Sequence, residues 1–279
     1  MVCRAPKGLT RWLRLAPVLG VLFGAPSAGL SSPATPPPLA PTERLSYTMY
    51  WIGVPVAESM LKSAGPVELP EGRAFHFIAT TESNHVLRLL YPVKTRVDSF
   101  VEAGRFLPIR YTMTGRQGFR KRDRELRFDQ AGQSVTLITE GRSRIYPTVA
   151  AVQDPLSAFY YYRMTASLEP GEVARIPVHD RKRPKEIIVT VGQVETVKTK
   201  AGTFETVRLK IEQEEGLFLH EGEVWLWMTT DARRLPVRVE ARVTLGTVVA
   251  ELTEVTREEP PPNVPTAHTE TAPSPHANQ

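Results

Sequence analysis

The sequence has almost no cysteine and no long hydrophobic run, and each absence excludes a class of protein. Its 279 residues include a single cysteine, Cys3, so the chain beyond it holds neither disulfides nor a cysteine-based zinc site. The apolar run from Leu15 to Phe23 is shorter than the roughly 20 residues that a bilayer span requires. Glycine (18 residues) is rarer than proline (25 residues) and follows no triplet repeat, which excludes a collagen-like chain.

Motifs of serine hydrolases and of metal sites are also lacking. Neither Ser59 nor Ser157 lies in a Gly-x-Ser-x-Gly segment, so the sequence does not predict a serine hydrolase. The histidines His76, His85 and His179 occupy separate segments and lack the spacing of metal ligands. We therefore predict no catalytic residue, no metal site and no cofactor.

The first 28 residues have the three parts of a secretory signal peptide. Basic residues without an acid come first, the apolar run follows, and small residues end the segment at Ala28. An uncleaved anchor is the alternative, but Arg14 bounds the apolar tract and Pro17 interrupts it. Three cleavage positions stay open, after Ser27, Ala28 or Gly29. We expect an exported protein with no membrane span in its mature chain.

The net charge of +5 is mainly a property of this leader. Thirty-five Lys and Arg residues face 30 Asp and Glu residues, and four of the cations lie in residues 1–28. The mature chain is therefore close to neutral, at about +1. Its charge does not indicate nucleic-acid binding.

Proline-rich segments border the central part of the chain. Residues 29–42 read as a Pro-rich linker, and residues 258–279, which include Pro260, Pro261 and Pro262, read as a disordered Pro/Thr-rich tail. Such segments cannot bury enough apolar surface to offset the entropy of ordering. We predict a single β domain over residues 43–257.

Alternation of apolar and polar residues with a period of two recurs through this domain, interrupted by turn residues. It predicts strands at 45–51, 56–64, 74–81, 93–102, 106–115, 122–129, 134–140, 173–178, 186–199, 204–212, 218–228, 236–243 and 248–255. No strand–helix–strand rhythm is present, so the sheet should be antiparallel. The predicted fold is mainly β: a large curved meander sheet, open or a half barrel, with one amphipathic helix packed across it.

That helix begins near Asp154, a good N-cap residue, with Pro155 at the first helical position. The residues Leu156, Phe159, Tyr160 and Arg163 then recur at helical spacing. We expect the aromatic side chains of this helix to fill the concave side of the sheet.

Basic and aromatic residues supply the candidate ligand-binding positions. On a strand, Arg120, Arg122 and Arg124 would project to one side. If they meet the second basic segment, 181–185, the two could bind phosphate or sulfate groups of lipopolysaccharide or anionic lipid. The alternative is a solvated hairpin face. Trp225 and Trp227 share one face of a strand, and they either fill a core or line an apolar groove.

Three blocks of sequence, in this order, resemble an exported bacterial family catalogued as domain of unknown function 3108. They are DPLSAFYYYR from Asp154, GQVETV with AGTF from Gly192, and VWLWMTTDARRLPV from Val224. The resemblance implies an envelope protein of Gram-negative bacteria, located in the periplasm, with an open, strongly curved antiparallel sheet. It implies no catalytic residues.

The signature of that family falls on Asp154, Pro155, Tyr160 and Arg163. We expect these four residues to hold the helix to the sheet. If Arg163 is buried, it needs a carboxylate partner, which the sequence does not identify.

Three functions follow from these observations. The first is a non-catalytic envelope protein that binds or carries an amphiphile or envelope polymer, such as a lipid, lipopolysaccharide or polysaccharide. The second is an interaction protein of an envelope assembly, with envelope proteins as partners. The third is a hydrolase that uses the acids between Glu212 and Glu223, which resemble ordinary solubilising charge at a hairpin tip.

Overall fold

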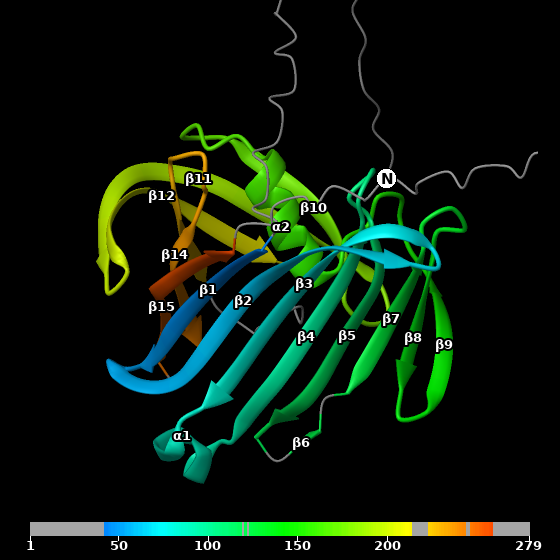
Figure 1. The fold of residues 1–279 in the computed structure, drawn as a ribbon, viewed down its shortest axis with the longest axis horizontal. Coiled ribbons are helices and arrows are strands. Elements are labelled where there is room, and N and C mark those ends of the chain that lie inside the picture. The colour runs from blue at the N-terminus through cyan, green and yellow to red at the C-terminus, as the bar shows by residue number, and fades with distance from the viewer. Residues whose placement is uncertain (1–41, 119, 122, 214–222, 244–245, 259–279) are drawn as a thin grey trace, which may run out of the picture. The chain divides into compact units, whose positions relative to one another are not determined.

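Fifteen strands hydrogen-bond into one antiparallel sheet in the computed structural model (Figure 1), which describes residues 42–118, 120–121, 123–213, 223–243 and 246–258. The strands are β1 (Thr42–Trp51), β2 (Val54–Leu69), β3 (Gly72–Ser83), β4 (Val93–Glu102), β5 (Pro108–Gln117), β6 (Arg120–Lys121), β7 (Arg124–Asp129), β8 (Ser134–Thr139), β9 (Arg142–Pro147), β10 (Val173–His179), β11 (Pro184–Thr199), β12 (Gly202–Gln213), β13 (Val224–Thr229), β14 (Pro236–Val243) and β15 (Gly246–Glu258). Two helices accompany them within the described ranges, α1 (His85–Leu90) and α2 (Pro155–Thr165).

The strand order confirms the predicted meander. It runs β10-β11-β12-β13-β14-β15-β1-β2-β3-β4-β5-β7-β8-β9, with β6 paired to β5 alone. Strands that follow one another in the chain are neighbours, except that β1 joins β15 and thereby links the two halves. The strands β9 and β10 end the path without pairing with each other, so the sheet is curved and open. The predicted signal peptide lies outside the described residues, as do the linker and tail apart from Thr42 and Glu258.

The sequence patterns missed β6, β9 and α1. Strand β9 follows a two-residue turn in which Glu140 and Gly141 both have positive φ, 51° and 72°, as a tight hairpin requires. Most of its side chains are exposed on both faces, so it shows no hydrophobic alternation. The strand β6 has two residues and α1 has six, which is too short for a periodic signal.

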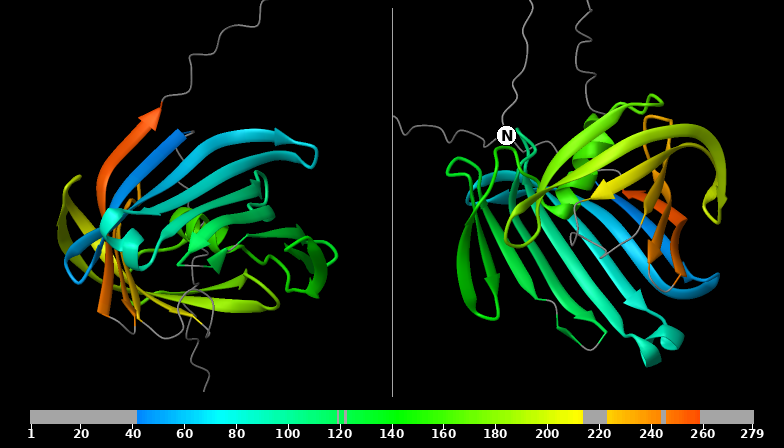
Figure 2. Two further views of the ribbon diagram at one scale, coloured as in Figure 1. Left: turned by 90° about the horizontal axis from the view of Figure 1, so that it is seen from below. Right: turned by 180° about the vertical axis from the view of Figure 1, so that it is seen from behind.

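Helix α2 lies inside the curl of the sheet, between its two halves (Figure 2). Ala158 and Tyr162 pack against buried aliphatic side chains of β10 to β13, including Val178, Leu209 and Met228. Leu156 and Tyr160 pack on the other half, where the ring of Tyr160 stacks on Phe77 with centroids 3.8 Å apart. The prediction that this helix packs across the concave side is confirmed, and the curl covers it on two sides.

The first turn of α2 is held by a buried carboxylate. Asp154 is the N-cap: its Oδ1 accepts hydrogen bonds from the N–H groups of Leu156 (2.8 Å) and Ser157 (2.9 Å). Its Oδ2 accepts a hydrogen bond from the hydroxyl of Ser99 in β4 at 2.6 Å. Burial raises the pKa of Asp154 to about 6, although these donors oppose the shift. The same side chain therefore starts the helix and ties it to the sheet.

The last turn is held by Arg163, whose expected carboxylate partner is Glu43 in β1. The guanidinium donates to both oxygens of Glu43, at 2.5 and 3.1 Å, and both side chains are buried. It also donates to the carbonyl oxygens of Arg233 (2.8 Å) and Arg234 (2.9 Å) in the β13–β14 turn. Burial alone would raise the pKa of Glu43, but Arg163 and Arg257 outweigh that effect and hold it below its ordinary value.

We predict that Glu43→Ala strongly destabilises the fold, because it leaves the guanidinium of Arg163 buried without its carboxylate. The expected loss in the free energy of unfolding is about 3 to 5 kcal/mol, measured by urea titration. Glu254→Ala is the matched control: its side chain is exposed on the neighbouring strand β15 and should cost less than about 0.5 kcal/mol. Equal losses in the two variants would contradict the role given to Glu43.

The raised pKa of Asp154 predicts a pH dependence of definite sign. Between about pH 6 and pH 4 the native carboxyl binds a proton that the unfolded chain does not, so acidification stabilises the native state. Relative to Asp154→Asn, which keeps a hydrogen-bond acceptor and carries no charge, wild type should gain about 2 kcal/mol between pH 7 and pH 4.5. Urea titrations of both proteins measure this difference. A difference that stays constant with pH would show that the pKa of Asp154 is not raised.

Candidate functional site

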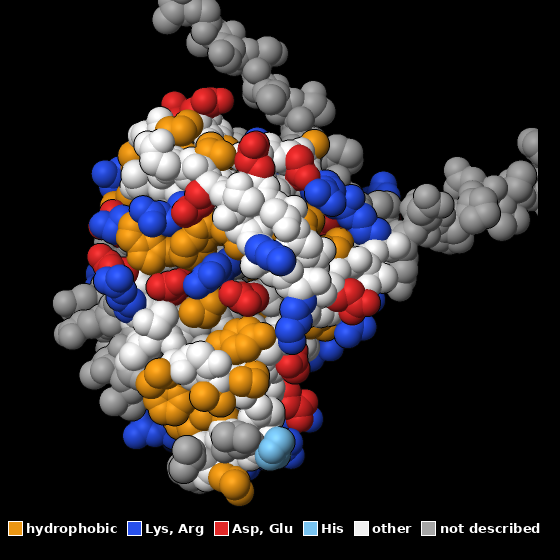
Figure 3. All heavy atoms as spheres, turned by 90° about the vertical axis from the view of Figure 1, so that its left-hand side faces the viewer, with side chains coloured by type: hydrophobic (Ala, Val, Ile, Leu, Met, Phe, Trp, Pro, Cys, Tyr) orange, Lys and Arg blue, Asp and Glu red, His pale blue; other side chains and the backbone are white. Residues whose placement is uncertain are grey.

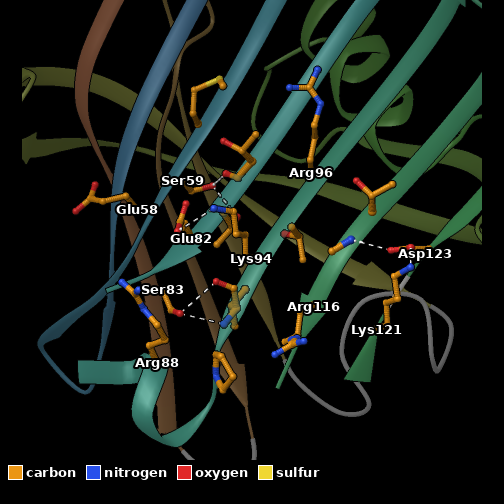
Figure 4. Close-up of a pocket in the computed structure, with 18 of the residues that line it drawn as sticks. Glu58, Ser59, Glu82, Ser83, Arg88, Lys94, Arg96, Arg116, Lys121 and Asp123 are labelled. Carbon is orange, nitrogen blue, oxygen red and sulfur yellow. Dashed lines mark hydrogen bonds and ion pairs between the residues drawn. The ribbon is translucent and has the colours of Figure 1, made fainter. Parts of the chain in front are cut away.

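An open groove of about 1290 Å³ crosses strands β1 to β6 beside α1 (Figure 4). One row of its side chains follows the strand register, each residue pairing with the next: Ser46, Met60, Thr80, Arg96 and Thr114. These positions alternate with those that face α2, such as Phe77 and Ser99, because side chains alternate between the two faces of a strand. The residues of this row therefore project from the face of the sheet opposite α2, while Thr81 and Thr95, which also line the groove, occupy alternate positions of the same strands.

A second row of the groove carries most of its charge. Following the register from β2 to β6, it consists of Glu58, Glu82, Lys94, Arg116 and Lys121. The acids occupy the β2 and β3 positions, and the cations occupy the β4 to β6 positions. Arg44, Arg88 and Arg96 add three further cations, and Asp123 adds a carboxylate. The lining thus holds six cations and three carboxylates.

Three of the cations form ion pairs, two of them with carboxylates of the groove itself. Lys94 Nζ lies 3.2 Å from Glu82 Oε1, and Lys121 Nζ lies 2.6 Å from Asp123 Oδ2. The hydrogen bond from Lys121 holds the pKa of Asp123 below its ordinary value, with help from the N–H of Gly115.

Arg96 is held at the upper part of the groove by Asp98. Its guanidinium binds both oxygens of Asp98, at 2.7 and 2.8 Å, and this hydrogen bonding raises the pKa of Arg96. Burial alone would raise the pKa of Asp98, but its hydrogen bonds with His76 and Arg96 outweigh burial and lower it. Arg96 is thus oriented by its neighbours.

The other three cations of the groove have no such partner. Among the described residues, no carboxylate forms an ion pair with Arg44, Arg88 or Arg116. Arg44 lies on β1 and Arg116 on β5, so four interstrand spacings, about 19 Å, separate their strands. A second groove of about 170 Å³ continues past Arg44 to Lys62 and Glu254. The arrangement can bind negative groups that are spaced along an extended molecule.

The predicted basic row is divided in the structure. Arg120 lies exposed in β6, Arg122 lies outside the described residues, and Arg124 begins the separate strand β7. Arg124 Nη2 lies 2.5 Å from the buried Asp180 Oδ1, and Arg181 Nε lies 3.5 Å from Asp180 Oδ2. The two basic segments therefore meet at a carboxylate. Burial raises the pKa of Asp180, although Arg124 and Arg181 oppose the shift.

The two tryptophans lie on β13, which is separated from β5, the only strand that β6 pairs with, by six strands in the sheet order. Both are half-buried, with the guanidinium of Arg208 over Trp225 at 4.7 Å and that of Arg238 over Trp227 at 5.3 Å. Trp227 Nε1 also donates to Glu195 Oε1 at 2.5 Å. Neither tryptophan lines the groove on β1 to β6, and their binding role stays a prediction.

The distances between the acids considered for hydrolysis are not all known, because residues 214–222 lie outside the described part of the chain. At its borders, Glu212 pairs with Lys210 (2.8 Å) and Glu223 with Arg242 (2.9 Å). Among the described residues, no group of three or more His, Cys, Asp or Glu side chains could hold a metal ion. None of the described helices has the length and apolar character needed to cross a membrane.

Most groove residues were not singled out from the sequence. Lys94 and Arg96 alternate along one predicted strand, which indicates a charged face, but their partners on β2, β3 and β5 follow only from the register. Of the four signature residues, Asp154 and Pro155 lie at the start of α2, and Tyr160 and Arg163 contact the sheet.

The family model described as "Protein of unknown function (DUF3108)" matches residues 46–253. No curated protein matches the chain.

Three solved structures cover most of the chain at low similarity. A β-barrel-like DUF1849 protein of Brucella abortus is 8% identical over 78% of this chain and 98% of its own, with a TM-score of 0.49. A candidate exported protein with a YmcC-like fold from Bacteroides fragilis is 13% identical (77% and 95%, TM-score 0.32). A candidate lipoprotein from Parabacteroides distasonis is 12% identical (77% and 95%, TM-score 0.34). At these scores none of them carries an argument about function.

The ion pair at Asp180 predicts that Arg124 contributes to stability. Arg124→Met should lower the free energy of unfolding by about 3 kcal/mol, because the buried carboxylate loses its nearest cation. Arg120→Met, which removes an exposed guanidinium from the adjoining strand, should change it by less than about 0.5 kcal/mol. Urea titration measures both. Equal, small effects would show that Arg124 is free to bind a ligand.

Proposed function

Since the chain belongs to the DUF3108 family of proteins of unknown function, we propose from its own geometry that it is an exported, non-catalytic protein that binds an anionic envelope polysaccharide. The binding site is the groove across β1 to β6, on the face opposite α2. The observation that carries the proposal is a set of three arginines in the groove, Arg44 on β1, Arg88 on α1 and Arg116 on β5, with which no described carboxylate forms an ion pair.

The chemistry of the lining favours a charged polymer over an acyl chain. Apolar ligands need an enclosed pocket with few charges, whereas this groove is open and six cations and three carboxylates lie along it. The concave side of the sheet is occupied by α2, which packs against both halves. Of the two ligand classes that the sequence suggested, the polymer therefore fits better.

The spacing of the cations favours an extended ligand. About 19 Å separates the strands of Arg44 and Arg116, which exceeds the reach of one phosphate or carboxylate. Guanidinium groups bind such anions in a bidentate manner, and the hydroxyls of Ser46, Thr80 and Thr114 between them can bind sugar hydroxyls. A polysaccharide with a negative group on successive sugars satisfies both requirements.

The test is calorimetric titration of the mature protein with an oligogalacturonide, whose sugars each carry a carboxylate, and with a neutral dextran oligomer of similar length. The oligogalacturonide should bind with an affinity that falls as salt rises, and the dextran should not bind. Arg44→Glu combined with Arg116→Glu should weaken binding by about 100-fold, since two charge-assisted contacts of about 1.5 kcal/mol each are lost.

The matched control is Arg142→Glu combined with Arg144→Glu, which makes the same charge change at two exposed positions of β9. This variant should bind as wild type does. Equal weakening in both double variants, or equal binding of dextran, would contradict a specific site in the groove.

A further inference from the structure

Large apolar side chains are exposed together at the end of the sheet that carries α1. Ile52 is 68% exposed and Val54 50% in the β1–β2 turn, while Leu89 in α1 is 84% exposed and Tyr91 after it 50%. Figure 3 shows orange side chains gathered at the lower end of the molecule, the end at which Figure 1 places α1 and this turn. We call these four residues the apolar tip.

Hydrogen bonds join the segments of the apolar tip. Asn84, which precedes α1, donates from its side chain to the carbonyl of Pro55 (2.6 Å) and from its N–H to that of Val56 (2.8 Å). On the other side, a Cβ at Gly118 would lie 2.5 Å from Cε2 of Tyr91, so the tyrosine ring lies against the β5–β6 connection. The tip is thus a supported surface formed by neighbouring segments.

The conformation of Ile52 indicates that folding does not explain its identity. Its φ is +49°, followed by +77° at Gly53, which is the two-residue hairpin turn that favours Asn-Gly. A β-branched residue is strained in this region, and here its side chain is exposed as well. The side chain lies close to Gly246 at the start of β15, but 68% of it is exposed, and strained, exposed apolar positions are typical of functional surfaces.

Cations surround the apolar tip. Arg88 lies in α1 beside Leu89, and Arg116 and Arg120 lie on the strands joined at Gly118. All three are exposed, and none forms an ion pair with a described carboxylate. Aliphatic and aromatic side chains bordered by Arg are the composition of surfaces that insert into the headgroup region of anionic membranes.

We propose that the apolar tip docks the protein on an anionic phospholipid surface, with Ile52, Leu89 and Tyr91 inserted at the boundary of headgroups and acyl chains. The unpaired arginines contact the lipid phosphates. Arg88 and Arg116 also line the groove, whereas the inserted side chains of Ile52, Leu89 and Tyr91 do not. Variants of these three residues therefore test docking separately from polysaccharide binding.

The test is co-sedimentation of the mature protein with vesicles of phosphatidylglycerol and phosphatidylcholine, against vesicles of phosphatidylcholine alone. Wild type should sediment with the anionic vesicles and much less with the neutral ones. Ile52→Asn combined with Leu89→Ser should lower partitioning into anionic vesicles by at least about tenfold, since the two side chains buried in lipid together contribute more than about 1.4 kcal/mol. A double variant that partitions as wild type does would overturn the proposal.

Two controls separate docking from folding and from general hydrophobicity. Ile145→Asn removes an isoleucine that is 72% exposed on β9 and should leave partitioning unchanged. Ile52→Asn alone should match or exceed wild type in thermal stability, because Asn tolerates positive φ, so its loss of vesicle binding cannot come from unfolding. Equal loss in Ile145→Asn, or no sedimentation of wild type with anionic vesicles, would overturn docking on lipid and leave a protein partner for this end. Oligogalacturonide binding should be unaffected by all of these variants.

Discussion

A buried guanidinium must have its charge and its donors satisfied, and the position of α2 depends on how this chain satisfies Arg163. Its partners come from two places in the sheet: the carboxylate of Glu43 in β1 and the carbonyls of the β13–β14 turn. Arg234 of that turn returns hydrogen bonds to the carbonyls of Arg163 and Ala166 at the end of α2. Because the sheet is open between β9 and β10, no ladder of hydrogen bonds fixes its curvature there. The helix, held at Asp154 to β4 and at Arg163 to β1, provides that constraint.

Placing the helix inside the curl decides which surfaces remain for function. The inward face of β3 to β5, β7 and β8 and of β10 to β13 buries α2, whereas the rows of alternate residues on β1 to β6 are polar and charged. The same strands end in the β1–β2 turn and α1, where the apolar tip lies. In the account proposed above, the groove would hold a charged polymer while the tip holds the protein against a lipid surface. Both surfaces lie on the part of the chain from β1 to β6, and α2 packs against the opposite face of β3 to β5.

Local chemistry made the helix and most strands predictable. The Asp154-Pro155 start of α2 is a capping signal that needs no knowledge of the fold, and alternation located strands such as β4 at its observed bounds. The acid that pairs with Arg163 lies 120 residues away, so no spacing rule could identify it. The groove could not be predicted either. Each of its rows combines single residues from five strands, and these residues are neighbours only in the observed register. Arg124 looked like a ligand contact because its partner, Asp180, lies 56 residues away in the sequence.

The most direct test of the central claim, that the face opposite α2 holds an envelope polymer, is native mass spectrometry of the mature protein purified gently from its own envelope fraction. The account predicts a retained glycan with negatively charged sugars, which dissociates when the salt concentration is raised. Retention of a free fatty acid in place of a glycan would contradict it, because such a ligand requires an enclosed apolar cavity, whereas the groove is open. A protein that carries no retained mass at low salt would contradict it as well.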